Sequence, residues 1–268
     1  MTKPAGRPRV IAIANQKGGV GKTTTAINLG TALAAVGEKV LVVDLDPQGN
    51  ASTGLGVDEG RRDVSAYDVL SRDASIAEAT VATGIPNLFV VPSTLDLLGF
   101  EREVLSSRDR AFRLRDAINA LAAGDAGFGY VMIDCPPSLN ILTINALAAA
   151  DSVLVPVQCE FFALQGIVQL KKTIDDVRSQ LNPTLDIQGV VLTMHDQRNK
   201  LSADVEGEVR RFFGDKVYRT LVPRNVRVAE APSFGKPILL YDHRCSGSQA
   251  YIKLAGEVIG REKQLRPA

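Results

Sequence analysis

A glycine-rich segment near the start of the chain constrains the fold more than any other feature. The apolar run at 10–14 has the length of a buried strand, and the Ala- and Leu-rich stretch at 22–36, followed by Gly37, has the pattern of a capped helix. Between them, three glycines fall within four positions, so the backbone can curl with its N–H groups pointing inward. A strand, a glycine-rich turn and a helix in this order are typical of a loop that holds phosphate.

The side chains of this loop indicate which phosphate ligand it holds. Lys22 is expected to reach the β- and γ-phosphates, and the Thr23 hydroxyl is expected to ligate Mg²⁺. The plain P-loop pattern needs glycine at position 16, where this chain has Gln16, but Lys17 adds a second ammonium and gives the deviant Walker A signature. We therefore predict that ATP and Mg²⁺ are bound by the whole loop, which consists of Lys17, Gly18, Gly19, Val20, Gly21, Lys22, Thr23 and Thr24.

Three aspartates follow apolar runs and are expected near the loop. Asp44 ends the run that starts at Lys39, and Asp46 lies just beyond it. There a carboxylate can orient an attacking water or hold the water shell of a metal, while Asp44 either supports the loop and metal or caps backbone amides. Asp134 ends an apolar run that begins at Tyr130, which is the Walker B arrangement, so we expect it to hold Mg²⁺ through water.

Strand-length apolar runs alternate with helical patterns along the chain, which predicts an α/β fold: a mostly parallel central sheet with helices on both faces, of the P-loop NTPase type. Ligands of such sheets bind beyond the carboxyl ends of the strands. The expected strands are 9–15, 39–44, 88–91, 130–134, 152–157 and 187–193. The expected helices are 22–36, 110–123, 139–149, 164–180, 202–213 and 248–262, and 49–72 is expected to be a mobile surface excursion.

Composition limits the other possibilities. The net charge is +1, so binding of a polyanion requires a local basic patch. The three cysteines are widely spaced, and the two histidines, His195 and His243, lack metal-like spacing, which argues against disulfides and zinc. Without a signal-peptide pattern, a cytoplasmic protein is expected. We predict one ATPase domain over 9–263, a flexible N-terminal tail at 1–8 and a C-terminal tail at 264–268.

With these motifs placed, the sequence resembles the ParA (Soj-type) family of chromosome-partitioning ATPases over nearly its whole length. The most diagnostic stretch contains Pro223-Arg224-Asn225-Val226-Arg227, because the phosphate loop alone would fit several relatives. The matching segments are 15–28, 44–50, 134–145, 153–166, 189–196 and 217–237.

The resemblance implies that the protein is a switch controlled by ATP binding and hydrolysis. ATP would drive formation of a sandwich homodimer, in which Lys17 reaches the nucleotide of the other subunit, and Asp46 would position the attacking water and share the Mg²⁺ site with Thr23 and Asp134. The dimer would bind double-stranded DNA without sequence preference and associate with the nucleoid. A centromere-binding partner of the ParB type would stimulate a hydrolysis reaction that is slow by itself.

The resemblance also implies further binding residues. Arg198 is the best match to the basic DNA-binding residues of the family, and arginine suits phosphate because its planar fork donates twice. The loop at 223–225 resembles the adenine-contacting loop of relatives, so Pro223, Arg224 and Asn225 are expected at the nucleotide, and Met194 is expected to line the base. Arg224 is thus a candidate for both ligands, and the other DNA-binding candidates are Lys200, Arg227 and Lys236.

Three alternatives share parts of this pattern. A MinD-like ATPase that cycles on membranes would need a basic amphipathic C-terminal helix, whereas residues 251–263 read as a helix packed on the core, and we expect no membrane binding. An iron–sulfur reductase like the nitrogenase iron protein would need paired cysteines at a dimer seam, a pattern that Cys135 and Cys159 do not match. A nucleotide-gated binding module without turnover differs from the main interpretation only in whether ATP is hydrolysed.

Overall fold

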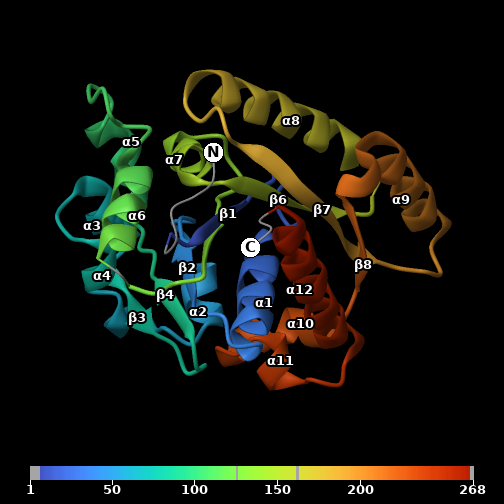
Figure 1. Ribbon diagram of the computed structural model, residues 1–268. Coiled ribbons are helices and arrows are strands. Elements are labelled where there is room, and N and C mark those ends of the chain that lie inside the picture. Colours follow the sequence, from blue (N-terminus) through green and yellow to red (C-terminus); the bar gives the residue numbers. More distant parts are fainter. Residues whose placement is uncertain (1–6, 125, 161–162, 266–268) are drawn as a thin grey trace.

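The central sheet has eight strands in the order β3-β4-β2-β5-β1-β6-β7-β8 (Figure 1). The computed structural model describes residues 7–124, 126–160 and 163–265. Neighbouring strands are parallel except for the short β3, which is antiparallel to β4. The strands are β1 Arg9–Ile13, β2 Val40–Asp44, β3 Val81–Ala82, β4 Leu88–Val91, β5 Tyr130–Asp134, β6 Ser152–Gln158, β7 Asp186–His195 and β8 Val217–Pro223.

Helices cover both faces of the sheet. On one face α1 and α12 contact each other and lie with α2, α10 and α11, and on the other face α6 to α9 lie with α3 to α5 (Figure 1). The longer helices are α1 Lys22–Ala35, α6 Arg113–Ala123, α7 Ile141–Ala149, α8 Ala163–Gln180, α9 Lys200–Phe213 and α12 Ser246–Leu265. The shorter ones are α2 Asn50–Gly54, α3 Ala66–Ser71, α4 Ile76–Ala79, α5 Leu97–Glu103, α10 Val226–Glu230 and α11 Ile238–Tyr241, with single 3₁₀ turns at Glu59–Arg61, Gly214–Lys216 and Ala231–Phe234.

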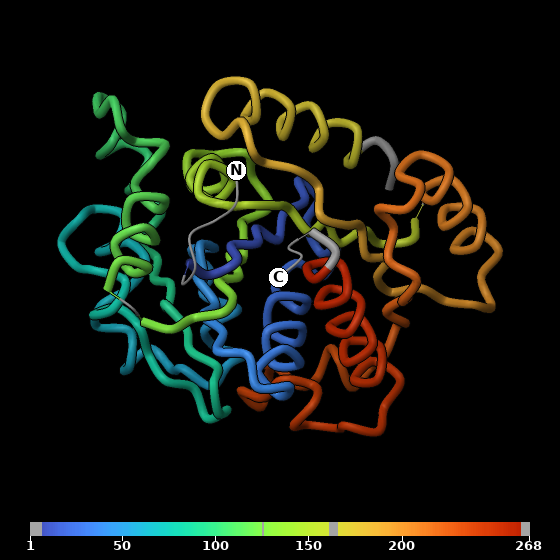
Figure 2. Tube along the Cα trace, in the orientation of Figure 1, coloured from blue at the N-terminus to red at the C-terminus, as the bar shows by residue number. Residues whose placement is uncertain are grey.

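The side chains of β1 show why its sequence is continuously apolar. Val10 and Ala12 pack into the core on one face, and Ile11 and Ile13 pack into the core on the other. Successive side chains of a strand point to opposite faces, so a central strand covered on both sides needs apolar residues at every position. In Figure 2 this central strand is blue, and it lies between β5 and β6, which come later in the chain. The predicted fold class is therefore confirmed.

Two predictions about segments need correction. The region 49–72 contains α2, a 3₁₀ turn and α3, and it buries apolar side chains such as Leu55 and Leu70. The helix α3 begins with a capping box in which Ser65 and Asp68 satisfy each other's backbone amides, a signal that the weak apolar periodicity of the segment concealed. The helix α12 extends to Leu265, so the proposed C-terminal tail starts inside it. Of the proposed N-terminal tail, residues 1–6 lie outside the described part of the chain.

Candidate nucleotide-binding site

The register of the three central strands brings the predicted acidic residues together. Asp134 of β5 is paired in register with Ile13 of β1 and with Asp44 of β2. All three residues are the last in their strands, and in a parallel sheet these ends meet at one edge. The phosphate loop leaves β1 at the same edge. Strand pairing alone therefore places the loop, Asp44 and Asp134 side by side.

The conformation of the phosphate loop depends on glycines with left-handed backbone angles. Gly19 and Gly21 have φ values of 74° and 87°, a left-handed conformation that side chains disfavour. Gly21 is the N-cap residue of α1 and offers no side chain to bond the first amides of that helix. These amides therefore remain available for an anion, as at other phosphate-binding helix N-termini.

Two polar side chains that were not among the predicted site residues form hydrogen bonds with the backbone of the phosphate loop. The Asn15 side chain donates to the Pro156 carbonyl at 2.7 Å and accepts from the Lys17 amide at 3.0 Å. The Thr193 hydroxyl of β7 donates to the Val20 carbonyl at 2.8 Å. Sequence reasoning missed Thr193 because its contact depends on the pairing of β6 with β7. It could have noticed Asn15 as a polar residue at the end of an apolar run.

The two lysines of the loop are held by different partners. Lys22 is buried, and its ammonium donates to the Lys17 carbonyl at 2.9 Å. Burial lowers the pKa of Lys22, and the nearby Asp134 carboxylate opposes that shift. The Lys17 ammonium is paired with Glu160, which follows β6. Glu160 was not predicted, because nothing near it in the sequence marks it as a partner of the loop.

Asp44 is occupied by backbone and hydroxyl donors. It accepts from the Ser52 amide at 2.8 Å, the Ser52 hydroxyl at 2.7 Å and the Asp46 amide at 3.2 Å. Burial raises its pKa to about 6, although the bonds from Ser52 act in the opposite direction. The structure thus shows Asp44 in the second of the two roles that the sequence allowed, as a cap for backbone amides at the start of α2.

Asp134 and Asp46 have carboxylate oxygens free for a ligand. Asp134 is fully buried, and neither of its carboxylate oxygens has a hydrogen-bond partner among the described residues. Burial raises its pKa well above the usual value, with a further contribution from Asp44, and the Thr23 hydroxyl and Lys22 act against that rise. Asp46 is half-buried, and one of its carboxylate oxygens accepts from the Gln48 amide at 3.0 Å.

These groups fit a magnesium nucleotide. Within the described residues, no three His, Cys, Asp or Glu side chains are grouped to hold a metal by themselves. Mg²⁺ is usually held by one or two carboxylates together with phosphate oxygens and water, so Thr23, Asp46 and Asp134 are a sufficient set of protein ligands. A buried carboxylate without a partner is costly, and a cation beside it removes that cost.

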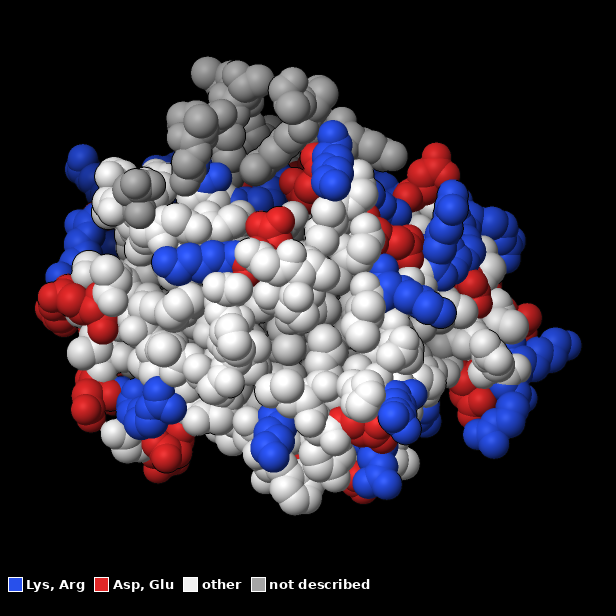
Figure 3. Space-filling view, turned by 60° about the horizontal axis from the view of Figure 1, so that its bottom comes forward, with Lys and Arg blue, Asp and Glu red and all other residues white. Residues whose placement is uncertain are grey.

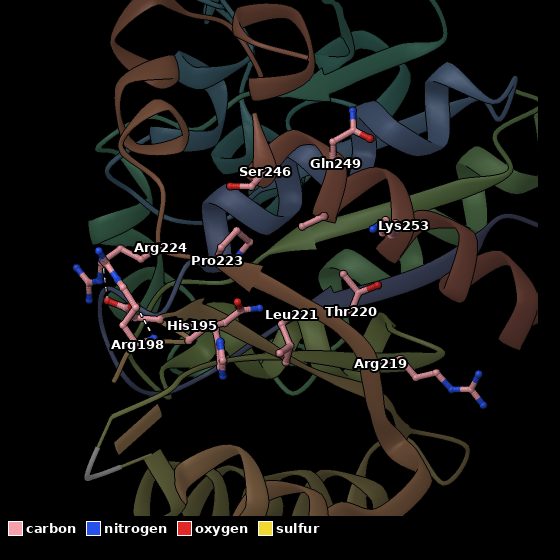
Figure 4. Close-up of a pocket in the computed structure, with 13 residues that line it drawn as sticks. His195, Arg198, Arg219, Thr220, Leu221, Pro223, Arg224, Ser246, Gln249 and Lys253 are labelled. Atoms are coloured by element: carbon pink, nitrogen blue, oxygen red, sulfur yellow. Dashed lines mark hydrogen bonds and ion pairs between the residues drawn. The ribbon is translucent and has the colours of Figure 1, made fainter. Parts of the chain in front are cut away.

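Several of the predicted base-contacting and DNA-binding residues lie at or just after the ends of β7 and β8. A cavity of about 790 Å³ is lined by Pro223, Arg224 and Arg198, together with residues of β8 and α12 (Figure 4). Met194, with a positive φ of 50°, and Asn225 are not in its wall. The Asn225 side chain instead caps α10 and donates to the Ser246 hydroxyl at 3.0 Å.

The predicted DNA-binding residues do not form one group on the surface. Arg198 is 91% exposed and bonds Asp196 beside it, and Arg224 shares the cavity with it. Lys200 and Lys236 are exposed but do not line the cavity, and the same holds for Arg227, whose guanidinium pairs with Glu230 at 3.2 Å. The cavity wall also contains Arg219 and Lys253, which sequence reasoning missed because nothing in the sequence places β8 and α12 beside Arg198.

The structure also bears on the membrane-cycling ATPase and the iron–sulfur reductase that were considered as alternatives. No helix in the described ranges 7–124, 126–160 and 163–265 is long and apolar enough to cross a membrane. Cys135 and Cys159 are both buried, and burial raises the pKa of the Cys159 thiol to about 12. His195 is buried, and its Nε2 lies 3.1 Å from a Glu206 carboxylate oxygen.

A mostly parallel sheet of this order, with a glycine-rich loop after β1 and carboxylates at the ends of the neighbouring β5 and of β2 beyond it, defines a P-loop nucleotide-binding protein. Residues 8–187 match the family described as "AAA domain". The chain is 62% identical to the chromosome partitioning protein ParA of Caulobacter vibrioides over 255 residues, which covers 95% of each chain. It is 51% identical to the sporulation initiation inhibitor protein Soj of Bacillus subtilis over 93% of this chain and 98% of that one. The chain belongs to the ParA/Soj family of chromosome-partitioning proteins.

Solved structures share this fold. The cobyrinic acid a,c-diamide synthase of Mycobacterium smegmatis with bound ADP and magnesium has a TM-score of 0.84 at 38% identity, and the alignment covers 97% of each chain. The septum site-determining protein MinD of Pyrococcus horikoshii with Mg-ADP has a TM-score of 0.76 at 27% identity over 97% of this chain and all of the other. The fold is thus shared by relatives with different names.

Proposed function

We propose that this chain is an ATP-driven partitioning switch: ATP binding pairs two copies, the pair binds DNA without reading its sequence, and a ParB-type partner stimulates hydrolysis. The region 9–263 acts as one ATPase unit in this proposal. The observation that carries it is the arrangement of Lys22, Thr23 and the buried Asp134, whose carboxylate oxygens have no hydrogen-bond partner among the described residues, around the glycine loop. That arrangement leaves positive charge, backbone amides and a free buried carboxylate at one point, which is what a magnesium triphosphate needs.

Each group of the site has a defined part in the proposed reaction. Lys22 and the loop amides bind and orient the phosphates, and Lys17 adds charge stabilisation to the transferred phosphoryl group of the partner subunit. Asp46 lies at the edge of the site with a free oxygen, and it orients the attacking water. Mg²⁺, when bound by Thr23, Asp46 and Asp134, neutralises charge on the phosphate oxygens.

DNA binding depends on local charge in this proposal. On the face shown in Figure 3, basic and acidic side chains alternate around the margin, and the centre is largely uncharged. The net charge of +1 likewise gives no general attraction to DNA. Arg198 and Arg224 supply a local patch at the cavity, and pairing of two subunits doubles the phosphate contacts, which steepens the dependence on salt.

The experiment that tests the proposal is retention of the purified protein on two DNA fragments of unrelated sequence with ATP, with ADP and without nucleotide. We expect retention on both fragments with ATP only, and faster phosphate release when a ParB-type protein is added. Arg198→Glu should keep ATP affinity and weaken retention on both fragments. Equal retention under all three nucleotide conditions would contradict the switch, and the absence of phosphate release would leave only a binding module.

A further inference from the structure

We propose that Arg219 and Lys253 contact the DNA backbone together with Arg198 and Arg224, so that the DNA path continues along the edge of the sheet to α12. This inference rests on the DNA binding proposed above. It extends that binding to two residues that were not among the predicted DNA-binding residues.

The position of the four basic side chains is the first observation. All four line the cavity of about 790 Å³ that lies between the carboxyl end of β7, β8 from Arg219 onward and the first half of α12. Arg198 and Arg224 lie together at one end of this cavity, Arg219 lies at the other, and Lys253 enters from α12 (Figure 4). None of the described residues in its wall belongs to the phosphate loop. The cavity is therefore a surface distinct from the phosphate-binding loop.

The charge balance of the cavity is the second observation. Its wall contains four Lys or Arg residues and one acidic residue, Asp196. That carboxylate is engaged by Arg198, at 3.2 and 3.3 Å from two guanidinium nitrogens. In a chain with 31 basic and 30 acidic residues, such an excess is local. It gives a positive potential that attracts a polyanion.

Arg219 and Lys253 are free to bind a ligand. Both are exposed, and within the described residues the side chain of neither forms an ion pair or a hydrogen bond. Glu257, one turn beyond Lys253 on α12, is already bonded by the Arg219 and Thr220 amides at 2.8 and 2.7 Å. The guanidinium groups of Arg198 and Arg227 pair with Asp196 and Glu230, so a phosphate would have to compete with a carboxylate at both, whereas it would not at Arg219 and Lys253.

The spread of these charges favours a backbone over a single anion. One phosphate cannot meet basic groups at both ends of the cavity, whereas successive phosphates of one strand can. Lysine and arginine contacts of this kind add affinity without base recognition. Log affinity falls with log salt concentration, and each contact makes this slope steeper by about 0.9. The cavity thus fits the phosphate backbone of double-stranded DNA.

The test compares matched variants of the full chain with ATP and Mg²⁺. Arg219→Gln, Lys253→Gln and the double variant are measured against Lys263→Gln, which removes an exposed lysine from the same helix α12 outside the cavity. Affinity for two unrelated duplexes is measured at several salt concentrations. We expect each single variant to reduce the salt slope by about one for every phosphate group that it no longer neutralises, equally for both duplexes, with ATP affinity and pairing unchanged.

The outcomes separate this inference from the proposed function. If Arg198→Gln reduces the slope while the double variant behaves like Lys263→Gln, Arg219 and Lys253 are not on the DNA path and the switch still stands. If the variants weaken only one of the duplexes, base reading replaces the proposed backbone contact. If the unmodified protein does not bind either duplex with ATP, the proposed function itself fails.

Discussion

Lys22 is the buried lysine of the phosphate loop. Its ammonium is buried and donates to the Lys17 carbonyl, and burial lowers its pKa while Asp134 helps to keep the charged form. An ammonium in such a place is stabilised most by an additional anion. In the proposed site the β- and γ-phosphates of a nucleotide would supply that anion, so the affinity for ATP should depend strongly on Lys22.

Replacement of Lys22 by alanine should abolish detectable ATP binding. Hydrogen bonds to charged groups each contribute about 1.5–3 kcal/mol, and Lys22 is expected to make more than one, so a loss of about 100-fold or more is expected. Titration with a fluorescent ATP analogue measures it, with Lys263→Ala as an exposed control. ATP affinity close to that of the unmodified protein would show that the loop is not the phosphate site.

The three cysteines differ in how well they can react. Burial raises the pKa of Cys159 to about 12 and that of Cys135 higher still, whereas Cys245 is only partly buried. The thiolate is the reactive form, so the two buried thiols should stay protonated at neutral pH. Iodoacetamide should therefore label Cys245 first in the folded protein at pH 8, and all three in denaturant, as followed by mass spectrometry. Earlier labelling of Cys159 would contradict the burial seen here.

At the scale of elements, the edge strand β8 is the least regular part of the sheet. Its pairing with β7 shifts register twice, between Val190 and Leu192 and between Leu192 and His195. The Glu257 carboxylate of α12 accepts hydrogen bonds from the Arg219 and Thr220 amides of β8. An edge strand with free amides is open to pairing with other chains, and this carboxylate covers two of them.

Glu257→Ala should lower the free energy of unfolding by about 1–3 kcal/mol, because two backbone amides lose a charged acceptor. Chemical denaturation monitored by circular dichroism measures the change, and ATP affinity should stay the same. Glu208→Ala, which removes an exposed acid from α9, is the matched control. Equal unfolding free energies for the two variants would mean that the hydrogen bonds to Glu257 do not stabilise the edge.

The accuracy of the element predictions follows from packing. Strands covered on both faces were predicted to within two residues at their ends, because continuous apolar runs leave few other interpretations. The strand β8 was not predicted, since Arg219 and Thr220 interrupt its apolar run at the exposed edge. The helices α2 and α3 were missed as well, because they are too short for a helical period and depend on local caps.

At the scale of the whole molecule, the proposed switch requires two subunits. In this single chain the Lys17 ammonium is paired with Glu160 of the same subunit. In the proposed dimer Lys17 would leave that partner for the nucleotide of the other subunit. Pairing and nucleotide binding are therefore linked, and a variant that binds ATP without hydrolysing it should accumulate as a dimer.

Asp46→Ala should be such a variant. It removes the carboxylate proposed to orient water but leaves Lys22, Asp134 and the glycine loop intact. We expect a dimer with ATP, measured by size-exclusion chromatography with light scattering, prolonged retention on DNA, and phosphate release reduced by about 10²-fold or more, as for other positioned catalytic groups. The unmodified protein with ADP provides the monomer reference. Detection of monomers alone with ATP would contradict the role given to Asp46.

The sequence by itself determined the fold class, the phosphate loop and the acidic residues at the strand ends, because each depends on a pattern local to one segment. Strand length, glycine spacing and a terminal aspartate can all be read without knowledge of neighbours. Only the tertiary structure decided which strands adjoin, and therefore that Asp44 caps α2 while Asp134 remains free. It also decided that Lys17 meets Glu160, and that β8 and α12 place Arg219 and Lys253 in one cavity. The physical reason is that such contacts join segments far apart in the chain, and only the packing of the sheet and helices brings them together.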